Sequence, residues 1–286
     1  MITKTNLIRG ALALAFVTTA FAADPFFFIQ ASDPQFGMFA ENKNFTQETA
    51  NWTFAIANIN RLHPAFLVVT GDLINNTGDA DQIAEYKRIN SGLNPAIHLY
   101  NVPGNHDVGN EPTPESIAAY RKNIGADYYS FREGPIYGIV LNSSYLKAPD
   151  KVKEEAAKQE IWLAAELEKM KATGALPVVF LHIPLFLKQP DEPEQYFNMP
   201  LPTRQRILAL LHRYNVHYVV AGHLHANSFG KEGDLEMITT AAEGKPIGPD
   251  PSGLRIFEVK GNALNHSYFP FGTLPNVYPV PAPSTK

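Results

Sequence analysis

Short apolar runs alternate with longer amphipathic stretches after residue 25. The runs over residues 26–31, 66–70 and 97–102 are rich in β-branched and aromatic residues, which is typical of strands. Between them, residues 47–62 and 80–89 have the spacing of amphipathic helices. Strands that alternate with helices predict βαβ units and a largely parallel sheet. On or beside the apolar face of the first helix we expect Ala50, Phe54, Ala57 and Ile59.

The pattern changes in the second half of the chain. Residues 128–131 and 136–141 are apolar runs joined by a turn-like stretch, which predicts an antiparallel hairpin. A long charged helix is predicted over residues 152–171, with four residues facing inward: Ile161, Leu163, Leu167 and Met170. Later strands are expected over residues 178–181, 216–220, 235–240, 254–259 and 263–268. An α/β fold with two sheets packed face to face and helices outside accommodates this order.

The first 22 residues have the pattern of an export signal. Lys4 and Arg9 precede an apolar run over residues 11–17, and residues 20–22 form a small-residue cleavage site. The apolar run is shorter than the roughly 20 residues that a membrane-spanning helix needs. We therefore expect a secreted or periplasmic mature protein that begins at residue 23 and has no stable membrane insertion. The alternative is a buried N-terminal helix or a membrane anchor.

Composition narrows the class of protein. A chain of 286 residues with 45% hydrophobic residues can bury a sizeable core, so we expect one catalytic domain over residues 23–269. The Pro-rich tail over residues 270–286 is expected to be extended or loosely attached. The sequence contains no cysteine, which excludes disulfides and thiolate metal ligands. Removal of Lys4 and Arg9 with the signal lowers the formal net charge from −4 to −6, which argues against a nucleic-acid partner.

Polar residues follow directly on several predicted strands, after Gly or a polar turn. These candidate functional residues are Asp33, Gln35, Asp72, Asn105, His106, Asp107, His182, His223 and His225. The carboxyl ends of parallel strands meet at one edge of a sheet, where α/β proteins bind their ligands. Each residue alone fits an ordinary turn or core position. Together they supply oxygen and nitrogen donors for two neighbouring divalent cations.

The donor types indicate phosphate-ester hydrolysis. Asp72 can serve as the single carboxylate that bridges two cations about 3.5–4 Å apart. Asn105 can give its oxygen to one metal, while His106 stabilises or protonates the departing oxygen with Asp107 behind its ring. Two divalent cations outweigh two carboxylates and a hydroxide, which leaves a positive centre suited to an anionic ester. The sequence has neither a Gly-X-Ser-X-Gly elbow nor a phosphate-binding Gly loop with Lys-Ser/Thr.

With these motifs, the chain resembles the calcineurin-like metallophosphoesterases from Asp33 to about Tyr268. Residues 32–37, 182–187, 196–198 and 250–255 more narrowly resemble the subgroup called calcineurin-like phosphoesterase domain-containing proteins, some of which are named serine/threonine phosphatases. The resemblance implies a four-layer α/β sandwich of two mixed sheets flanked by helices. It also implies a dinuclear-metal-dependent phosphoesterase in which hydroxide held by the metals attacks phosphorus.

The resemblance further implies two ligand sets. One metal would take Asp33, Asp72 and His225, with Gln35 where the wider family usually has His. The other metal would take Asp72, Asn105, His182 and His223. Gln35 either gives an amide oxygen or leaves its place to a water. Two Mn, Fe or Zn ions are expected, with Mn favoured because an oxygen replaces a nitrogen donor.

The substrate is less readable than the metal centre. The leading hypothesis is a phosphomonoesterase, similar to protein phosphatases, that acts on a phosphorylated small molecule or a phosphoprotein. A phosphodiesterase acting on cyclic nucleotides or phospholipid head groups is one alternative, and a noncatalytic metal-binding protein is another. Residues 188–204 either roof the site or form an ordinary connection, and Lys245 and Arg255 are candidate phosphate contacts.

Overall fold

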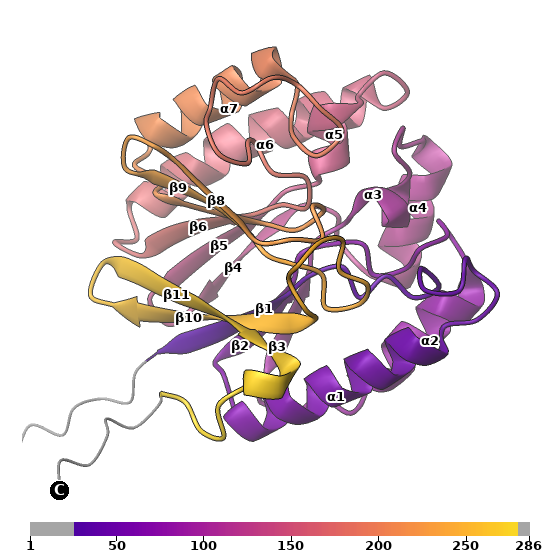
Figure 1. Ribbon diagram of the computed structural model, residues 1–286. Coiled ribbons are helices and arrows are strands. Elements are labelled where there is room, and N and C mark those ends of the chain that lie inside the picture. The colour runs from indigo at the N-terminus through magenta and orange to yellow at the C-terminus, as the bar shows by residue number, and fades with distance from the viewer. Residues whose placement is uncertain (1–25, 280–286) are drawn as a thin grey trace, which may run out of the picture.

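Two β-sheets lie face to face at the centre of the molecule, and helices cover the outer side of each sheet (Figure 1). This computed structural model describes residues 26–279. The expected signal over residues 1–22 and the last seven residues of the tail lie outside the described residues. The four layers and the mixed sheets confirm the fold class expected from the sequence.

The first sheet combines three parallel strands with an antiparallel pair. Its strand order is β11 (Ala263–Pro270), β10 (Gly253–Lys260), β1 (Phe27–Ala31), β2 (Phe66–Val69) and β3 (His98–Asn101). Strands β1, β2 and β3 are parallel, whereas β10 runs antiparallel to both β1 and β11. Helices α1 (Thr46–Leu62) and α2 (Ala80–Asn90) cover the outer face of this sheet (Figure 1).

The second sheet has a parallel centre with an antiparallel strand at each edge. Its order is β4 (Tyr129–Glu133), β5 (Ile136–Val140), β6 (Leu176–Phe180), β7 (Tyr218–Ala221), β9 (Leu235–Thr239) and β8 (Ser228–Glu232). The predicted hairpin is the antiparallel β4–β5 pair, and β5, β6, β7 and β9 are parallel. Helices α6 (Lys153–Lys171) and α7 (Leu201–Arg213) cover its outer face (Figure 1).

Aromatic side chains fill the space between the two sheets. Phe28 of β1 is fully buried, and its ring stacks on Phe66 at 4.5 Å and on Phe257 at 4.7 Å between centroids. It also meets Phe180 of the other sheet edge-on at 6.0 Å. Because successive strand residues face opposite sides, the neighbouring Ile29 points instead into the core beneath α1 and α2. Strand β1 is therefore buried on both faces.

Two helix faces differ from the sequence expectation. Ile161 of α6 is 73% exposed, whereas Leu163, Leu167 and Met170 face inward as expected. Residues two apart on a helix lie on opposite sides, so Ile161 cannot share a face with Leu163.

The same reasoning corrects the apolar face of α1. Phe54 is 44% exposed, and Ala50 and Ala57 are also exposed. The buried face of α1 is built from Trp52, Ala55, Ile56, Ile59 and Leu62. Of the four residues expected on or beside the apolar face, Ile59 alone is buried.

Several short elements and two longer helices were not expected. The short helices are α3 (Asn105–Val108), α5 (Ser143–Lys147) and the 3₁₀ turn η1 (Phe271–Thr273). Helix α4 (Pro114–Asn123) begins with Thr113, whose hydroxyl caps the main-chain N–H of Ser116. Helix α7, which was also missed, begins at Leu201 with Pro at its first turn.

The described part of the tail is held on α1 rather than loosely attached. Arg61 of α1 donates hydrogen bonds to the carbonyls of Pro275 and Asn276, and Tyr278 packs on Phe27. Apolar and aromatic contacts therefore outweigh the Pro-rich composition in this segment. Within residues 26–279, no helix is both long and apolar enough to cross a bilayer.

Replacing Phe28 by Ala should lower the free energy of unfolding by about 3–5 kcal/mol, because a stacked aromatic ring between the sheets would leave a cavity. Urea unfolding of metal-free protein measures the change. Ile161→Ala is the matched control: this side chain is exposed, so its effect should stay within about 0.5 kcal/mol. Similar losses in the two variants would contradict the assigned core.

Candidate metal centre

The expected site residues come together at the carboxyl ends of the parallel strands. Asp33 follows β1, Asp72 follows β2, Asn105 opens α3 after β3, His182 follows β6, and His223 and His225 follow β7. These loops gather on the side of the two sheets where α3 lies (Figure 1). Strands from both sheets therefore deliver donors into one space, as the sequence predicted.

Two groups of buried donors share one carboxylate. Ligand atoms of Asp72, His182 and His223 lie within 4.8 Å of one another, and so do those of Asp33, Asp72 and His225. His182 Nε2 lies 3.1 Å from Asp72 Oδ2, and His225 Nε2 lies 3.4 Å from Asp33 Oδ1. The arrangement fits two cations with Asp72 between them.

Main-chain carbonyls fix which ring nitrogen of each histidine is free. His182 donates from Nδ1 to the carbonyl of Thr70 at 2.7 Å, which leaves Nε2 facing Asn105 Oδ1 at 3.0 Å. His225 donates from Nδ1 to the carbonyl of Lys245 at 2.7 Å. In both residues Nε2 is therefore the nitrogen that a metal can bind once it is deprotonated.

Unpartnered oxygens show that the donor set fits a cation. Asp33 Oδ1 and Gln35 Oε1 are buried and have no hydrogen-bond partner among the described residues. The amide nitrogen of Gln35 donates to Asn75 Oδ1 at 3.1 Å, so its oxygen is the free end. Buried oxygens without a donor are costly unless a cation satisfies them. Gln35 therefore fits as an oxygen ligand.

Glycines allow the ligand loops to approach one another closely. A Cβ on Gly104 would lie 2.1 Å from the main-chain nitrogen of Asp72, and one on Gly222 would lie 1.8 Å from Ser32 Oγ. Neither position has room for a side chain. These two glycines bring the Asn105 and His223 loops against the Asp72 and Asp33 loops.

Burial and neighbouring charge set the protonation of the metal-free centre. Burial opposes charge on His182, but Asp72 and Asp33 outweigh it and raise the pKa of His182 to about 9. Burial, together with the charge of His182, lowers the pKa of His223 to about 3. Burial also opposes the charge of Asp72, yet His182 lowers the pKa of this carboxyl below its usual value.

His106 adjoins the centre through a main-chain contact with Asp72. Its main-chain N–H donates to Asp72 Oδ1 at 2.8 Å, and its Nδ1 donates to the carbonyl of Asn75 at 2.7 Å. The ring therefore presents Nε2 as the nitrogen that can hold an exchangeable proton. The carbonyl of Asn75, rather than Asp107, orients this ring.

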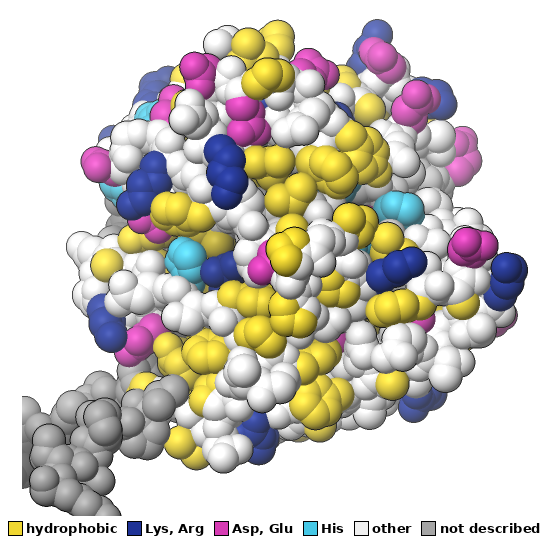
Figure 2. All heavy atoms as spheres, viewed as in Figure 1, with side chains coloured by type: hydrophobic (Ala, Val, Ile, Leu, Met, Phe, Trp, Pro, Cys, Tyr) yellow, Lys and Arg dark blue, Asp and Glu magenta, His cyan; other side chains and the backbone are white. Residues whose placement is uncertain are grey.

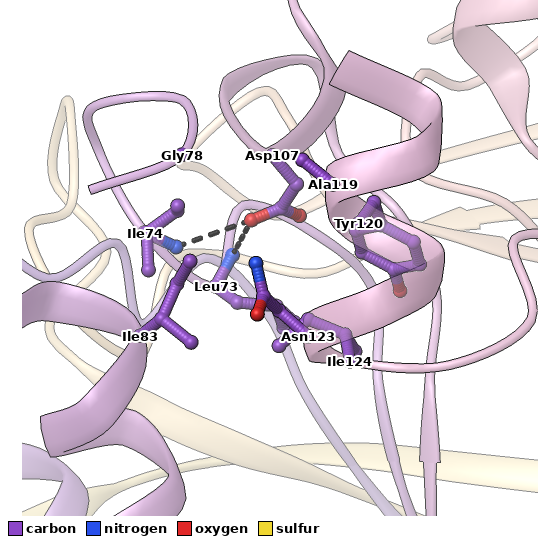
Figure 3. Close-up of a pocket in the computed structure, with 9 residues that line it drawn as sticks. All are labelled: Leu73, Ile74, Gly78, Ile83, Asp107, Ala119, Tyr120, Asn123 and Ile124. Atoms are coloured by element: carbon purple, nitrogen blue, oxygen red, sulfur yellow. Dashed lines mark hydrogen bonds between the residues drawn. The ribbon is translucent and has the colours of Figure 1, made fainter. Parts of the chain in front are cut away.

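Asp107 braces the loops instead of supporting His106. Its carboxylate accepts main-chain N–H bonds from Leu73 at 2.9 Å, Ile74 at 3.2 Å and Gly104 at 2.7 Å. Figure 3 shows the carboxylate turned toward Leu73 and Ile74, over a pocket that Tyr120 also lines. Burial and the charge of Asp72 raise the pKa of Asp107 to about 8. The expected role behind the His106 ring is therefore corrected to a structural one.

The pocket below Asp107 is not a substrate site. Its volume is about 10 Å³, which is room for about one water molecule. It lies between the loop that carries Leu73 and Ile74 and helix α4, with apolar residues on most sides (Figure 3). The candidate site in this region is therefore the space at the strand ends, where the donor side chains lie.

Arg255 is not a phosphate contact. It is 6% exposed, and its guanidinium donates to Thr240 Oγ1 at 2.7 Å and to Asn227 Oδ1 at 2.6 Å. The guanidinium of Arg255 is therefore engaged in hydrogen bonds inside the protein.

The other candidate phosphate contact, Lys245, lies beside the centre. Its Nζ lies 5.8 Å from the ring centroid of Phe39, and its main-chain carbonyl accepts from His225.

Four supporting groups were not predicted from the sequence. They are the main-chain carbonyls of Thr70, Asn75, Tyr196 and Lys245, which orient four histidine rings. A carbonyl is present in every residue, so no residue type marks it in a sequence. The side chain of Tyr196, which reaches Asn105 from the segment after β6, was given no role from the sequence beyond its place in the resembling segment 196–198.

The geometry of the centre agrees with the known proteins to which this chain is similar. Residues 28–227 match the family model described as calcineurin-like phosphoesterase. The chain belongs to the calcineurin-like phosphoesterase family. The serine/threonine-protein phosphatase CPPED1 of Danio rerio is 35% identical over 260 residues, which are 85% of this chain and 84% of the relative. The human protein of the same name is 34% identical over 262 residues, with 86% and 83% covered.

Solved structures show the same fold. A dimetal phosphatase from Danio rerio has a TM-score of 0.65 at 15% identity, with 86% of this chain and 96% of that chain covered. A purple acid phosphatase from yellow lupin has a TM-score of 0.64 at 14% identity, with 87% and 52% covered. With its family established, this calcineurin-like phosphoesterase is a metal-dependent phosphoric ester hydrolase with a site for two divalent metals.

Metal binding should release protons in a pH-dependent way. Near pH 7 the metal-free His182 carries a proton, because its pKa is raised to about 9, and a metal can bind only the deprotonated nitrogen. We expect His182 to contribute about one proton to this release near pH 7 and almost none above pH 10. Calorimetric titration with Mn in buffers of different ionisation enthalpy measures this release.

The same shift has a consequence for stability with a defined sign. A raised histidine pKa stabilises the folded metal-free chain below about pH 6.5, and this contribution is lost as the pH rises through about 9. His182→Asn is the control for the calorimetric proton release, since it lacks this proton and should release about one proton fewer near pH 7. An equal release in the variant and the unaltered protein would contradict the assignment.

Proposed function

We propose that this enzyme hydrolyses phosphate monoesters of phosphoproteins or phosphorylated small molecules with two divalent cations. The observation that carries the proposal is the pair of buried Asp/His groups that share Asp72. Asp72, which belongs to both groups, would let two cations bind side by side, and such a pair supplies the charge stabilisation that phosphate-ester hydrolysis needs.

The proposed ligands follow the geometry of the free atoms. One cation takes Asp33, Asp72, His225 and Gln35, whose unpartnered oxygens and free Nε2 support this set. The other takes Asp72, Asn105, His182 and His223. We call these the Gln35 position and the His182 position.

The metal-loaded centre would attract the phosphoryl group, and His106 would move a proton. When bound, the two cations acidify water and withdraw charge from the phosphoryl oxygens. Asp33 and Asp72 contribute two negative charges, while the amide and imidazole ligands stay neutral. The centre remains positive and attracts an anionic ester. His106 holds a proton on Nε2 and gives it to the departing oxygen, while the carbonyl of Asn75 keeps the ring in place.

Monoesters are favoured over diesters by charge and by the relatives. A monoester dianion gains more from a positive centre than a diester monoanion does. The relatives are named serine/threonine-protein phosphatases, which supports a phosphomonoester substrate. A structure with the same fold at 14% identity and a TM-score of 0.64 is described as GAP50, the anchor in the inner membrane complex of Plasmodium, so the fold alone does not imply turnover.

Gln35 favours Mn at its position. An amide oxygen is a harder and weaker donor than imidazole, which shifts preference from Zn toward oxygen-tolerant cations such as Mn. We therefore propose that the metal at the Gln35 position is Mn and the more weakly held of the two.

Export is the remaining part of the proposal. It is supported by the sequence pattern of residues 1–22, in which Lys4 and Arg9 precede an apolar run and a small-residue site. A secreted or periplasmic enzyme would meet phosphate esters outside the cytoplasm. The excess of acidic over basic residues also speaks against nucleic acid as its partner.

The substrate class is tested with para-nitrophenyl phosphate and its bis-ester at saturating Mn. We expect kcat/KM for the monoester to exceed that for the diester by at least about tenfold, which corresponds to about 1.4 kcal/mol of transition-state stabilisation. Faster hydrolysis of the diester would favour the phosphodiesterase alternative.

His106→Ala is the control for turnover at this centre. It should lower kcat for an alkyl monoester such as phosphoserine about 100-fold without changing metal content, because the departing alkoxide needs the proton that His106 supplies and His106 is no metal ligand. The loss with para-nitrophenyl phosphate should be smaller, since its leaving group needs little protonation. Ligand binding that persists with unchanged residual hydrolysis in this variant would favour the noncatalytic alternative.

The two metals should differ in affinity. After dialysis against a chelator, calorimetric titration with Mn should resolve two steps, and Gln35→His should tighten the weaker step and raise its preference for Zn, because it restores a nitrogen donor. Metal analysis by mass spectrometry counts the bound ions. Equal affinities in the unaltered enzyme would refute the inequality of the two positions.

A further inference from the structure

The segment between β6 and α7 is held rigidly beside the centre. Within it, the carboxylate of Glu192 accepts main-chain N–H bonds from Leu187 at 2.7 Å, Lys188 at 2.9 Å and Gln189 at 3.2 Å. Glu192 Oε1 also accepts from the side chain of Asn198 at 2.8 Å. One carboxylate thus organises both ends of this connection.

Two positively charged side chains, from helices α7 and α5, hold the same segment from outside. Arg204 of α7 is fully buried and donates to the carbonyls of Pro190, Glu192 and Met199. Lys147 of α5 donates to the carbonyls of Gln195 and Asn198 at 2.8 and 2.5 Å. These charged groups hold the loop in one conformation, so a side chain that the loop carries is fixed in position before any ligand binds.

The residue presented is Tyr196. Its hydroxyl accepts a hydrogen bond from Asn105 Nδ2 at 3.3 Å and donates to Asn110 Oδ1 at 3.3 Å. Asn105 Nδ2 also donates to Asn110 Oδ1 at 3.1 Å. Together these bonds fix the amide of Asn105, so that its Oδ1 faces His182 Nε2 at 3.0 Å.

Tyr196 also contacts His223. Its carbonyl lies 3.2 Å from His223 Nε2 and accepts from it, which leaves Nδ1 as the free nitrogen of that ring. The rings of Tyr196 and His223 lie 4.9 Å apart between centroids, and Phe197 packs on His223 at 5.6 Å. A residue 52% exposed therefore orients two polar side chains of the centre at once.

We propose that Tyr196 is a positioning residue for the His182 position: its hydroxyl orients Asn105, its carbonyl selects the tautomer of His223, and the braced segment holds both. This rests on the ligand sets of the proposed function. The contacts of Tyr196 reach two ligands of one cation, whereas Lys245 supports the other cation through His225. Tyr196 thus acts on one of the two metals.

The experiment is calorimetric titration of the metal-free enzyme with Mn. The step that His182→Asn abolishes identifies the His182 position. Tyr196→Phe, which keeps the ring and the carbonyl, should weaken binding at this step about tenfold and leave the other step unchanged, since it removes one of the two acceptors that hold the Asn105 amide and no contact of the other position. An unchanged His182 step, or equal weakening of both steps, would overturn the proposal.

Matched variants separate positioning from folding. Tyr137→Phe removes a hydroxyl that bonds Glu166 at 2.6 Å on α6, and both binding steps should remain unchanged. Lys147→Met loosens the segment without touching the centre and should weaken the His182 step about threefold. No effect of Lys147→Met would refute the role of the segment. Because the readout is metal affinity, weakening in Tyr196→Phe alongside a wild type that hydrolyses neither ester would refute the proposed function and leave this inference standing.

Discussion

A buried glutamine holds the two sheets in register directly behind the centre. Gln30 of β1 is fully buried and donates to the carbonyl of Ala221 in β7 at 2.9 Å, while its own oxygen accepts from Thr240 at 2.6 Å. The ligands come from both sheets, so any slip between the sheets would separate Asp72 from His182. In a dry interface a satisfied amide fixes position, whereas apolar packing alone tolerates sliding. The aromatic stack around Phe28 supplies cohesion, and Gln30 supplies alignment.

The metal-ligand residues adopt a backbone conformation that is uncommon for residues other than glycine. Asp33, Gln35, Asp72, His223 and His225 all have positive φ, between 41° and 69°. Each such residue costs of order 1 kcal/mol or more relative to ordinary backbone. Main-chain bonds between the ligand loops, such as those from Asp33 to Gly71 at 3.1 Å and from Gln35 to Asp72 at 2.8 Å, offset this cost. Sharp turns at the strand ends thereby aim side chains of different loops into one space.

The sequence predicted the strands and helices that follow from patterns along the chain, and it missed the side-chain contacts that depend on three-dimensional packing. Alternating apolar runs predicted β1, β2, β3 and the β4–β5 hairpin, because strand and helix periods are written in neighbouring residues. The donor residues were predicted because each follows a strand. The face of α6 was misjudged at Ile161, where an apolar residue lies on the solvent side. Arg255 and Asp107 were given functional roles because charge suggests chemistry, yet both are consumed by internal hydrogen bonds. Which partner a polar group finds is decided by packing, which a pattern does not encode.

The two metal positions are supported from opposite sides yet share Asp72. Residues of the β6–α7 segment brace one position, and the segment that carries Lys245 braces the other. Two cations a few ångströms apart repel each other, and the bridging carboxylate is the group that lowers this repulsion. The second cation to bind therefore meets both the charge of the first and a carboxylate already engaged. In the proposed ligand sets each position has one amide oxygen, from Gln35 or Asn105, and they differ in that the Gln35 position has Asp33 where the His182 position has a second imidazole. The proposed order of loading therefore rests on the number of nitrogen ligands, and the position braced by Tyr196, which has two imidazoles, is expected to fill first.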